Sequence, residues 1–465
     1  MNENSKSSFY LTTSIPYVNA PPHIGFAQEL LAADVLARYY RKLGKDVWFL
    51  TGTDEHGLKI VKAAQEADKT EQEFADEISA KFRNLSELLN ISNDDFIRTT
   101  EPRHLKIPQE LWQKAQKDIY KKKYQALYCV GCESFLTKSD LVNGKCPIHK
   151  SEPELIDEEN YFFKLSNYTE KIKQLLLNNP DFIKPRSRYN EILSFVESGL
   201  EDISISRPKE KLSWGISVPG DENQIMYVWF DALSNYLSAK KYWPADLHII
   251  GKDILRFHAA LWPAMLLSVG YELPKQIYVH GFISVDGHKM SKSLGNVIAP
   301  QELVEKFGVD ATRYLLLKLL NFSEDSDFSW DKAVACYNAD LANDLGNLVM
   351  RVITLALKCK NQNAKIKMIN QNSNRIEKIE NLQFQEYLIE IWKEISAMNQ
   401  EVDHKKLWKL VKDDPEKAKA ELSNLFDRIY TVAEQIEPFM PESSQKIKDQ
   451  LNSLTPEPLF PKVEK

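Results

Sequence analysis

Apolar positions in the first fifty residues follow two different periods. The segment FYLTTSIPYV is rich in β-branched and aromatic residues and predicts a strand. From Ile24 to Leu43 the apolar residues recur at helical spacing, with a stripe through Leu30 and Val35, and Gly44 suits the end of that helix. VWFLTGTDEHG then predicts a second buried strand that runs into a polar loop. This strand–helix–strand order is typical of a parallel α/β sheet.

The α/β pattern is interrupted and later resumes. Residues 117–224 hold a cysteine cluster and several proline turns, so we interpret them as an inserted domain. MYVWFDAL, LHIIGKD and IYVHGFI restore the pattern of strands and helices, and beyond Asn338 long helical patterns predict an all-α helix bundle. The predicted order is a Rossmann-type parallel sheet in two halves, 1–116 and 225–300, around the insertion, then a connecting region 301–337 and the bundle 338–465.

Composition narrows the class of protein. A chain of 465 residues is long for one core, so several domains are expected. The net charge of −6 does not point to nucleic acid, although a basic patch can lie on an acidic protein. The N-terminus has no apolar run typical of a signal peptide, and no stretch approaches eighteen apolar residues. We therefore expect a cytoplasmic protein without a membrane span.

Cysteine and histidine residues in the insertion have the spacing of a metal site. Cys129 and Cys132 form one C-x2-C pair, and Cys146 and His149 form a C-x2-H pair shortly after it. Two such pairs supply the four ligands of a tetrahedral structural zinc. The alternative is three buried free cysteines and a surface histidine, but four ligand-type residues seldom coincide at paired spacing. We predict one structural Zn²⁺ per chain.

Two further motifs suit phosphate binding. Pro22-His23-Ile24-Gly25 stands where the first helix begins, and helix N-termini attract anions. Lys289-Met290-Ser291-Lys292-Ser293 lies between glycines, so such a loop can bring two ammonium groups onto a triphosphate. Each motif alone has a commoner explanation, an ordinary helix start or a solvated turn. Their joint occurrence on the two halves of one sheet favours nucleotide chemistry.

This pair of motifs resembles the HIGH and KMSKS signatures of class I aminoacyl-tRNA synthetases. Further segments (TSIPYVNAPPHIG, FLTGTDEHG, YVWFDAL, IIGKDILRFH, DLANDLGNLVMR) are similar to the methionyl-tRNA synthetase family, and the resemblance spans nearly the whole chain. It implies activation of L-methionine with ATP and Mg²⁺ to methionyl-adenylate and pyrophosphate, then transfer to the terminal adenosine of tRNA(Met). It also implies that residues 301–337 contact the tRNA stem and that the bundle binds the anticodon.

The resemblance assigns roles to individual residues. It places His23, Gly25, Lys289 and Lys292 at the ATP phosphates, with His23 and the two lysines catalytic, and Gly251 and Asp253 in the ATP site, Asp253 at the ribose. The implied methionine site contains Ile15, Tyr17, Asp54, Trp229, Ala232, Tyr236, Ile254, His258 and Trp262. A carboxylate such as Asp54 can bind the α-ammonium, and aromatic rings contact a thioether favourably. Without the resemblance these aromatic residues would be ascribed to the core.

The resemblance also implies that Asn347 and Arg351, one helical turn apart, and Trp408 bind a CAU anticodon. An Asn/Arg pair is more often simply solvated and a single Trp is more often core, and Leu407 replaces the proline that usually precedes this tryptophan. Leu233 likewise departs from the proline found there in some members. The chain stops soon after the bundle, without room for a further dimerising domain, so we expect a monomer.

Other members of the class fit less well. Isoleucine, leucine and valine enzymes carry a large editing domain, whereas this insertion is largely explained by its zinc element. A cysteine enzyme is expected to hold zinc in the active site. The alternative from a different class is a catalytically inactive RNA-binding paralogue, favoured by Phe26, which stands where the first signature has histidine. If the helix begins at the turn, the rings of His23 and Phe26 share one face.

Overall fold

A computed structural model describes residues 7–136, 140–290, 295–359 and 373–464. Side chains of residues 134, 135, 373 and 374 are outside that description. The chain divides into two compact units. Unit 1 consists of residues 1–22, 43–86 and 92–280, and unit 2 of residues 23–42, 87–91 and 281–465. No helix in the described ranges is long and apolar enough to cross a membrane.

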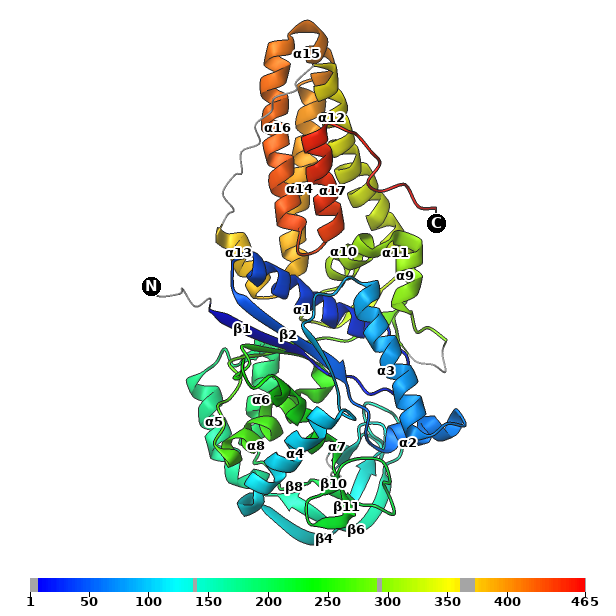
Figure 1. Ribbon diagram of the computed structural model, residues 1–465, viewed down its shortest axis with the longest axis vertical. Coiled ribbons are helices and arrows are strands. Elements are labelled where there is room, and N and C mark those ends of the chain that lie inside the picture. The colour runs from blue at the N-terminus through cyan, green and yellow to red at the C-terminus, as the bar shows by residue number, and fades with distance from the viewer. Residues whose placement is uncertain (1–6, 137–139, 291–294, 360–372, 465) are drawn as a thin grey trace. The chain divides into compact units, whose positions relative to one another are not determined.

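Unit 1 is built on a parallel six-stranded sheet (Figure 1). Its order is β3-β2-β1-β12-β13-β7, and every neighbouring pair is parallel. β1 and β2 are buried along almost their whole lengths, which explains their continuous apolar runs. The strands are β1 Ser8–Thr13, β2 Asp46–Thr53, β3 Asp95–Arg98, β7 Ile183–Lys184, β12 Leu247–Gly251 and β13 Ile277–His280.

The predicted insertion contains two antiparallel sheets. The larger has the order β5-β4-β6-β8 and the smaller β10-β11-β9. The two-residue strand β7 lies within residues 117–224 but pairs with β13 of the parallel sheet. Because the strand is so short, the sequence contains no signal for this pairing. The strands are β4 Ile119–Cys129, β5 Ser134–Leu136, β6 Glu154–Phe163, β8 Ile203–Ser204, β9 Ser206–Pro208, β10 Ser217–Val218 and β11 Asp221–Met226.

Helices of unit 1 enclose its principal core. That core contains aromatic residues from several elements, Trp112, Phe230 and Trp262 among them. The α-helices are α2 Leu58–Glu66, α3 Glu71–Leu88, α4 Pro102–Lys114, α5 Thr169–Asn178, α6 Arg186–Glu197, α7 Val228–Ala232 and α8 Trp262–Val269. Shorter helical turns are η1 Gln116–Asp118, η3 Leu165–Tyr168, η4 Leu233–Ala239, η5 Lys252–Ile254 and η6 Phe257–Leu261.

Unit 2 combines the first predicted helix with the helical last third. Helix α1 (Ile24–Lys42) ends one residue before the predicted Leu43, and Gly44 lies just beyond it with φ +83°. Its burial extends beyond the predicted stripe to Asp34, whose carboxylate receives hydrogen bonds from Arg38 and from the fully buried Arg313. Arg313 also donates to the carbonyls of Pro438 and Phe439. One buried guanidinium thus joins α1 to the chain segment at Pro438 and Phe439.

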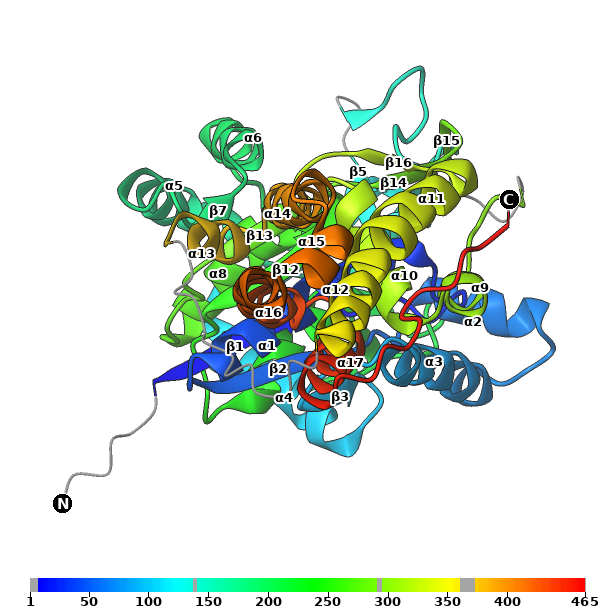
Figure 2. The ribbon, with the colours of Figure 1, turned by 90° about the horizontal axis from the view of Figure 1, so that it is seen from above.

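The bundle of unit 2 contains long helices that lie side by side in both views (Figures 1 and 2). Within the described ranges every element after Asn338 is helical, as predicted. The helices are α9 Pro300–Phe307, α10 Val309–Leu319, α11 Trp330–Cys336, η8 Tyr337–Gly346, α12 Asn347–Lys358, α13 Ser373–Glu380, α14 Phe384–His404, α15 Leu407–Asp413, α16 Pro415–Ile436 and α17 Pro441–Ser453. A small sheet, β15-β14-β16, is formed by His288–Lys289, Ile283–Val285 and Ser326–Phe328.

Candidate active site and metal centre

The strand order of unit 1 contains a switch point between β1 and β12. From β1 the chain continues to β2 and β3 on one side, and β12 is followed by β13 on the other. Open α/β sheets bind ligands beyond the carboxyl ends of the strands at such a point. Tyr17 follows β1, Asp54 follows β2 and Asp253 follows β12, so the sheet brings three predicted site residues to one edge.

Asp54 is a buried carboxylate with an incomplete set of partners. Its side chain is 3% exposed, and its Oδ1 has no hydrogen-bond partner among the described residues. Its backbone N–H donates to the carbonyl of Pro16 at 2.9 Å, which fixes it beside the segment that carries Tyr17. Burial raises the pKa of Asp54 well above its usual range, and the charges of Asp231 and Glu133 raise it further. A cation at Oδ1 would relieve this cost.

Aromatic rings surround Trp229 on helix α7. Trp229 stacks on Phe257 with ring centroids 4.0 Å apart. Tyr17 and His258 both meet it edge to face, at 6.4 and 6.0 Å. Within the described part of the chain the Tyr17 hydroxyl and the Trp229 indole N–H are buried without hydrogen-bond partners. Buried donors are normally paired, so these two atoms together with Asp54 Oδ1 point to a polar ligand.

His258 is held in one tautomer. Its Nδ1 donates to the carbonyl of Ile254 at 3.0 Å, so its Nε2 accepts from the Tyr236 hydroxyl at 2.8 Å. Burial lowers the pKa of His258 to about 4, which keeps the imidazole neutral at physiological pH. Trp262 packs on Tyr236 with centroids 6.0 Å apart, and its indole N–H has no partner in the described ranges. These four residues form a rigid, uncharged wall.

The remaining predicted site residues of unit 1 do not all lie beside Trp229. Ala232 is buried at the end of α7. Ile15 is partly buried against a separate cluster with Tyr10 and Leu50, rather than in the core of Trp229. Gly251 ends β12, and a Cβ there would lie 2.9 Å from an oxygen of the exposed Asp253. A side chain at position 251 would therefore displace that carboxylate.

Parts of both phosphate motifs lie together in unit 2. The N–H of Ile24 donates to the carbonyl of Ile298, and a Cβ on Gly25 would lie 3.9 Å from Met290 Cε. His23 precedes the helix, is exposed, and accepts the N–H of Gly25 at Nδ1, 3.0 Å away. The neutral ring then carries its proton on Nε2, free to donate to an anion. α1 begins directly after His23, and Phe26 in its first turn is only 8% exposed, so a shared face of the two rings stays a prediction.

The second phosphate motif begins on a hairpin. Asp286 and Gly287, both with positive φ, connect β14 to β15 in a two-residue turn that Asp-Gly sequences favour. Lys289 ends β15 with its side chain exposed, and its ammonium lies 5.7 Å from the ring centroid of Phe282. Asn296 donates to the carbonyl of Lys289 and closes the base of the loop. The predicted Lys292 lies outside the described residues.

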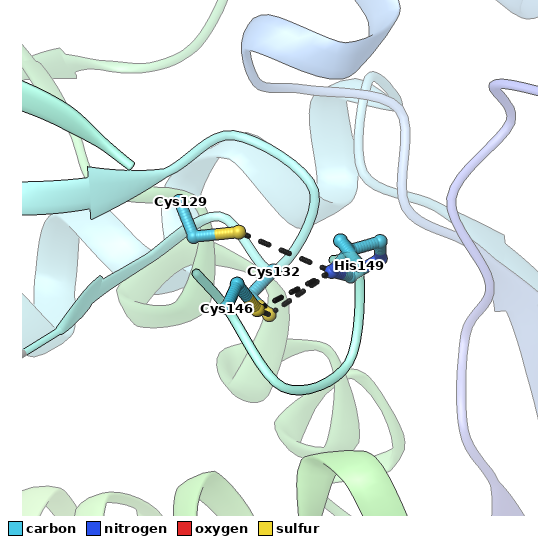
Figure 3. Close-up of side chains that lie close together, drawn as sticks. All are labelled: Cys129, Cys132, Cys146 and His149. Carbon is cyan, nitrogen blue, oxygen red and sulfur yellow. Dashed lines mark hydrogen bonds between the residues drawn. The ribbon is translucent and has the colours of Figure 1, made fainter. Parts of the chain in front are cut away.

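The predicted metal ligands converge in unit 1 (Figure 3). Their ligand atoms lie within 4.8 Å of one another. His149 Nδ1 is 3.9 Å from Sγ of Cys129, 3.2 Å from Cys132 and 3.9 Å from Cys146, and the Sγ atoms of Cys132 and Cys146 are 3.6 Å apart. Zinc bonds of about 2.3 Å to sulfur and 2.0 Å to nitrogen give tetrahedral edges of roughly 3.5 to 3.8 Å. The cluster therefore fits a four-coordinate zinc.

The three residues implied for the anticodon lie on the bundle. Asn347 and Arg351 are one turn apart on α12, as predicted, with Asn347 exposed. Arg351 is paired with the exposed Asp403 at 2.5 Å. Trp408 is 42% exposed on α15, unusual for a large apolar side chain. The alternative that Trp408 belongs to the core is thus wrong.

Two features escaped the sequence analysis. Asp231 of α7 accepts from both His56 and His104, at 2.7 and 2.6 Å, and all three side chains are buried. Glu133, beside the predicted metal ligand Cys132, accepts the N–H of Lys59 at the start of α2. Both pairings join residues far apart in sequence, and the only available signal was a charged residue within an apolar segment.

Comparisons with known proteins agree with this architecture. The family model described as "tRNA synthetases class I (M)" matches residues 9–152 and 137–353. The methionine–tRNA ligase of Caldanaerobacter subterraneus subsp. tengcongensis is 43% identical over 96% of this chain and 74% of its own length. That of Rickettsia felis is 42% identical over 98% of this chain and 94% of its own.

A solved structure extends the likeness to the fold. The methionyl-tRNA synthetase of Mycobacterium tuberculosis in complex with methionyl-adenylate has a TM-score of 0.90 and 37% identity, covering 98% of this chain and all of that one. The apo form of the same enzyme gives 0.83. Motifs, sheet topology and relatives agree, and the chain belongs to the methionyl-tRNA synthetases, class I enzymes that act as methionine–tRNA ligases.

Proposed function

We propose that methionine binds beyond β1 and β2, with its α-ammonium on Asp54 and its thioether against the rings of Tyr17, Trp229 and Trp262. The observation that carries this is the buried Asp54 carboxylate, whose Oδ1 has no partner in the described ranges. The relative with a bound methionyl-adenylate supports a site of this kind. Neutral His258 and Tyr236 complete the wall, with Ala232 and Ile254 as smaller apolar neighbours, and Ile15 is proposed to reach the site from its separate cluster with Tyr10 and Leu50.

ATP is proposed to bind through two groups of residues. His23, through Nε2, Lys289 and Lys292 act on the phosphates, with Gly25 beside them at the start of the helix, while Gly251 and Asp253 hold the ribose. The methionine carboxylate attacks the α-phosphate in line, and the two ammonium groups stabilise the charge that develops on the leaving pyrophosphate. Mg²⁺ would enter with ATP and offset part of the phosphate charge. The terminal adenosine of tRNA then accepts the methionyl group, and AMP leaves.

The metal is proposed to be structural zinc. Cys129, Cys132, Cys146 and His149 fill all four tetrahedral positions, so no open position is left for catalysis. A Cβ on Gly131 would lie 2.4 Å from Cγ of His149, so a close turn of the knuckle depends on that glycine. Metal analysis tests this: about one zinc per chain is expected, and Cys146→Ser lowers the zinc content. Zinc unchanged in that variant would contradict the ligand set.

The bundle, residues 338–465, is proposed to read the CAU anticodon with Asn347, Arg351 and the exposed Trp408. Exposed aromatic rings stack on single-stranded bases, and Arg351 can exchange its partner Asp403 for a base or phosphate. The stem-contact role of residues 301–337, the cytoplasmic location and the monomeric state stay proposals. Sedimentation equilibrium at micromolar concentration tests the last, and a dimer mass would refute it.

The decisive experiment compares two carboxylates at neighbouring strand ends. Asp54→Asn should raise the methionine KM in ATP–pyrophosphate exchange by about tenfold to a hundredfold, since it loses a charge-assisted hydrogen bond. Asp253→Asn should instead raise the KM for ATP. An unchanged methionine KM in Asp54→Asn would refute the site.

A pH series gives a second check on Asp54. Binding of the ammonium requires the carboxylate form, and burial raises the pKa of Asp54 in the free protein. Methionine affinity should therefore be full above that pKa and fall as the pH falls through it. The decline should begin at a higher pH than an ordinary aspartate would give.

A further inference from the structure

Glu133 occupies an unusual place in the zinc knuckle, the segment that carries Cys129, Cys132, Cys146 and His149. It directly follows the ligand Cys132, has a left-handed backbone with φ +49°, and is 1% exposed. Its own N–H donates to the carbonyl of Val130, which closes the turn between the first two cysteines. Its carboxylate is not in the four-ligand cluster. A buried acid that binds no metal needs another reason for its position.

The Glu133 carboxylate caps helix α2. The backbone N–H of Lys59, in the first turn of that helix, donates to Oε1 at 2.8 Å. A carboxylate here also complements the partial positive charge of the helix start. The other oxygen lies against Gly57, where a Cβ would come within 2.6 Å of Oε2. Gly57 has φ +105°, so both its backbone and the adjacent carboxylate require glycine.

The capped residue, Lys59, lies five residues after the proposed ammonium-binding group, Asp54. Asp54 directly follows β2 and begins the short turn that ends at Gly57, before α2. The Lys59 ammonium lies 4.1 Å from the ring centroid of Tyr17. On the other side, the Tyr227 hydroxyl donates to the backbone carbonyl of Glu133. Tyr227 immediately precedes α7, which carries Trp229. Glu133 therefore contacts both segments that bring polar groups to the proposed methionine site.

We propose that Glu133 is a positioning residue that couples the zinc knuckle to the Asp54–Lys59 turn. The metal fixes the turn from Cys129 to Cys132, that turn fixes Glu133, and Glu133 fixes the start of α2. Zinc then contributes to methionine binding without touching substrate. The coupling to methionine rests on the proposed role of Asp54, whereas the mechanical link from the knuckle to α2 does not.

Hydrogen exchange without substrate tests the mechanical link. In zinc-loaded Glu133→Ala, amides of residues 57–61 should exchange about fivefold to thirtyfold faster, the usual effect of losing a buried charged cap. Chelation of zinc should produce the same acceleration in the natural protein. In Glu133→Ala chelation should add no more than about twofold at these amides, because the link is already broken. If Glu133→Ala does not fold, Glu133→Gln takes its place. Because glutamine keeps an acceptor, the exchange at residues 57–61 should again become faster, but by a smaller factor.

Steady-state kinetics test whether the link from Glu133 to α2 affects methionine binding. Glu133→Ala should raise the methionine KM by about threefold or more and leave the ATP KM and zinc content unchanged, since a displaced turn costs orientation at one substrate. Glu73→Ala is the control, a helix-capping glutamate at an exposed position. Glu73 accepts the N–H of Thr70 at 3.1 Å at the start of α3, so it also caps a helix in unit 1 without touching the knuckle. Its loss should affect exchange near α3 and not the methionine KM.

The outcomes separate this inference from the proposed site. Unchanged exchange at residues 57–61 in zinc-loaded Glu133→Ala overturns the link. Faster exchange with an unchanged methionine KM overturns the positioning role, provided Asp54→Asn does raise that KM. If Asp54→Asn also leaves it unchanged, the proposed methionine site has failed, and the exchange data alone decide the link.

Discussion

Asp231→Asn removes a buried carboxylate while keeping the size of its side chain. In the natural protein Asp231 Oδ2 pairs with Nδ1 of His56 at 2.7 Å and Oδ1 pairs with Nε2 of His104 at 2.6 Å. His56 lies two residues after Asp54, and Asp231 lies two residues after Trp229. The carboxylate thus ties the end of β2 to α7 and α4, within unit 1. We expect the variant to be destabilised and weaker in methionine binding.

The size of the effect follows from the pKa of Asp231. Burial alone raises this pKa, but the charges and hydrogen bonds of His56 and His104 outweigh burial and lower it from 3.8 to about 2. At 1.36 kcal/mol per unit, the carboxylate contributes about 2 kcal/mol above pH 4. Leaving two buried histidines unpaired can raise the loss to about 3 to 5 kcal/mol. For a unit of this size, 2 kcal/mol corresponds to about 4 to 8 °C in Tm.

Calorimetry at a series of pH values measures both parts of the prediction. The native carboxyl has a lower pKa than the unfolded one, so its contribution is present above about pH 4 and disappears as the pH falls towards 2. The natural protein should show that acid decline in the transition of unit 1. Asp231→Asn should begin from a lower Tm at pH 7 and lack this part of the decline.

Glu77→Gln is the control, because Glu77 also has a lowered pKa. Hydrogen bonds from Lys69 and then Lys81 lower it to about 2, but the group is fully exposed to water. Solvent screens such pairs, so no resolvable change in Tm is expected. The reasoning is refuted if Asp231→Asn melts within about 1 °C of the natural protein, or if its acid decline is unchanged.

Three further predictions concern catalysis and tRNA. Lys289→Ala should lower kcat for ATP–pyrophosphate exchange by about 10²–10³ with little change in methionine KM, and an effect on KM alone would contradict its phosphate role. Arg351→Ala should reduce charging of tRNA and leave exchange intact, whereas equal loss of both would remove it from the anticodon site. The natural protein should catalyse exchange despite Phe26, and Phe26→His should change kcat more than methionine KM. Exchange found only in Phe26→His would mean that this position had switched catalysis off.

Local features of the chain could be predicted because local physics determines them. The bounds of α1 and its glycine end follow from helical spacing and from the backbone that Gly44 tolerates. The metal ligands follow from two knuckle spacings, and their atoms do converge. The resemblance located Tyr17, Trp229 and His258, which composition alone would have assigned to the core. The structure packs them together, and within the described ranges the Tyr17 hydroxyl and the Trp229 indole N–H have no hydrogen-bond partner.

Long-range pairings could not be predicted in this way. β1 lies next to β12, more than two hundred residues later in the chain, and no periodicity records that choice. Asp231 reads as one acid in an apolar segment, and its partners His56 and His104 are 175 and 127 residues away. The left-handed backbone of Glu133 also has no signal in the sequence, because a non-glycine residue adopts this conformation only when the surrounding structure requires it.

Two buried aspartates show how environment divides roles within one site. Asp231 and Asp54 are both almost inaccessible to water, yet the pKa of Asp231 is lowered to about 2 and that of Asp54 is raised well above its usual range. The difference is that Asp231 has two imidazole partners, whereas Asp54 has an oxygen without a partner in the described residues. A carboxylate whose partners belong to the protein stabilises the fold. A carboxylate buried at a desolvation cost, and lacking a cation, is instead suited to receive one from a ligand. The negative charge of Asp231 raises the pKa of Asp54 further, so the carboxylate that stabilises the fold also favours the proposed binding of the methionine ammonium at Asp54.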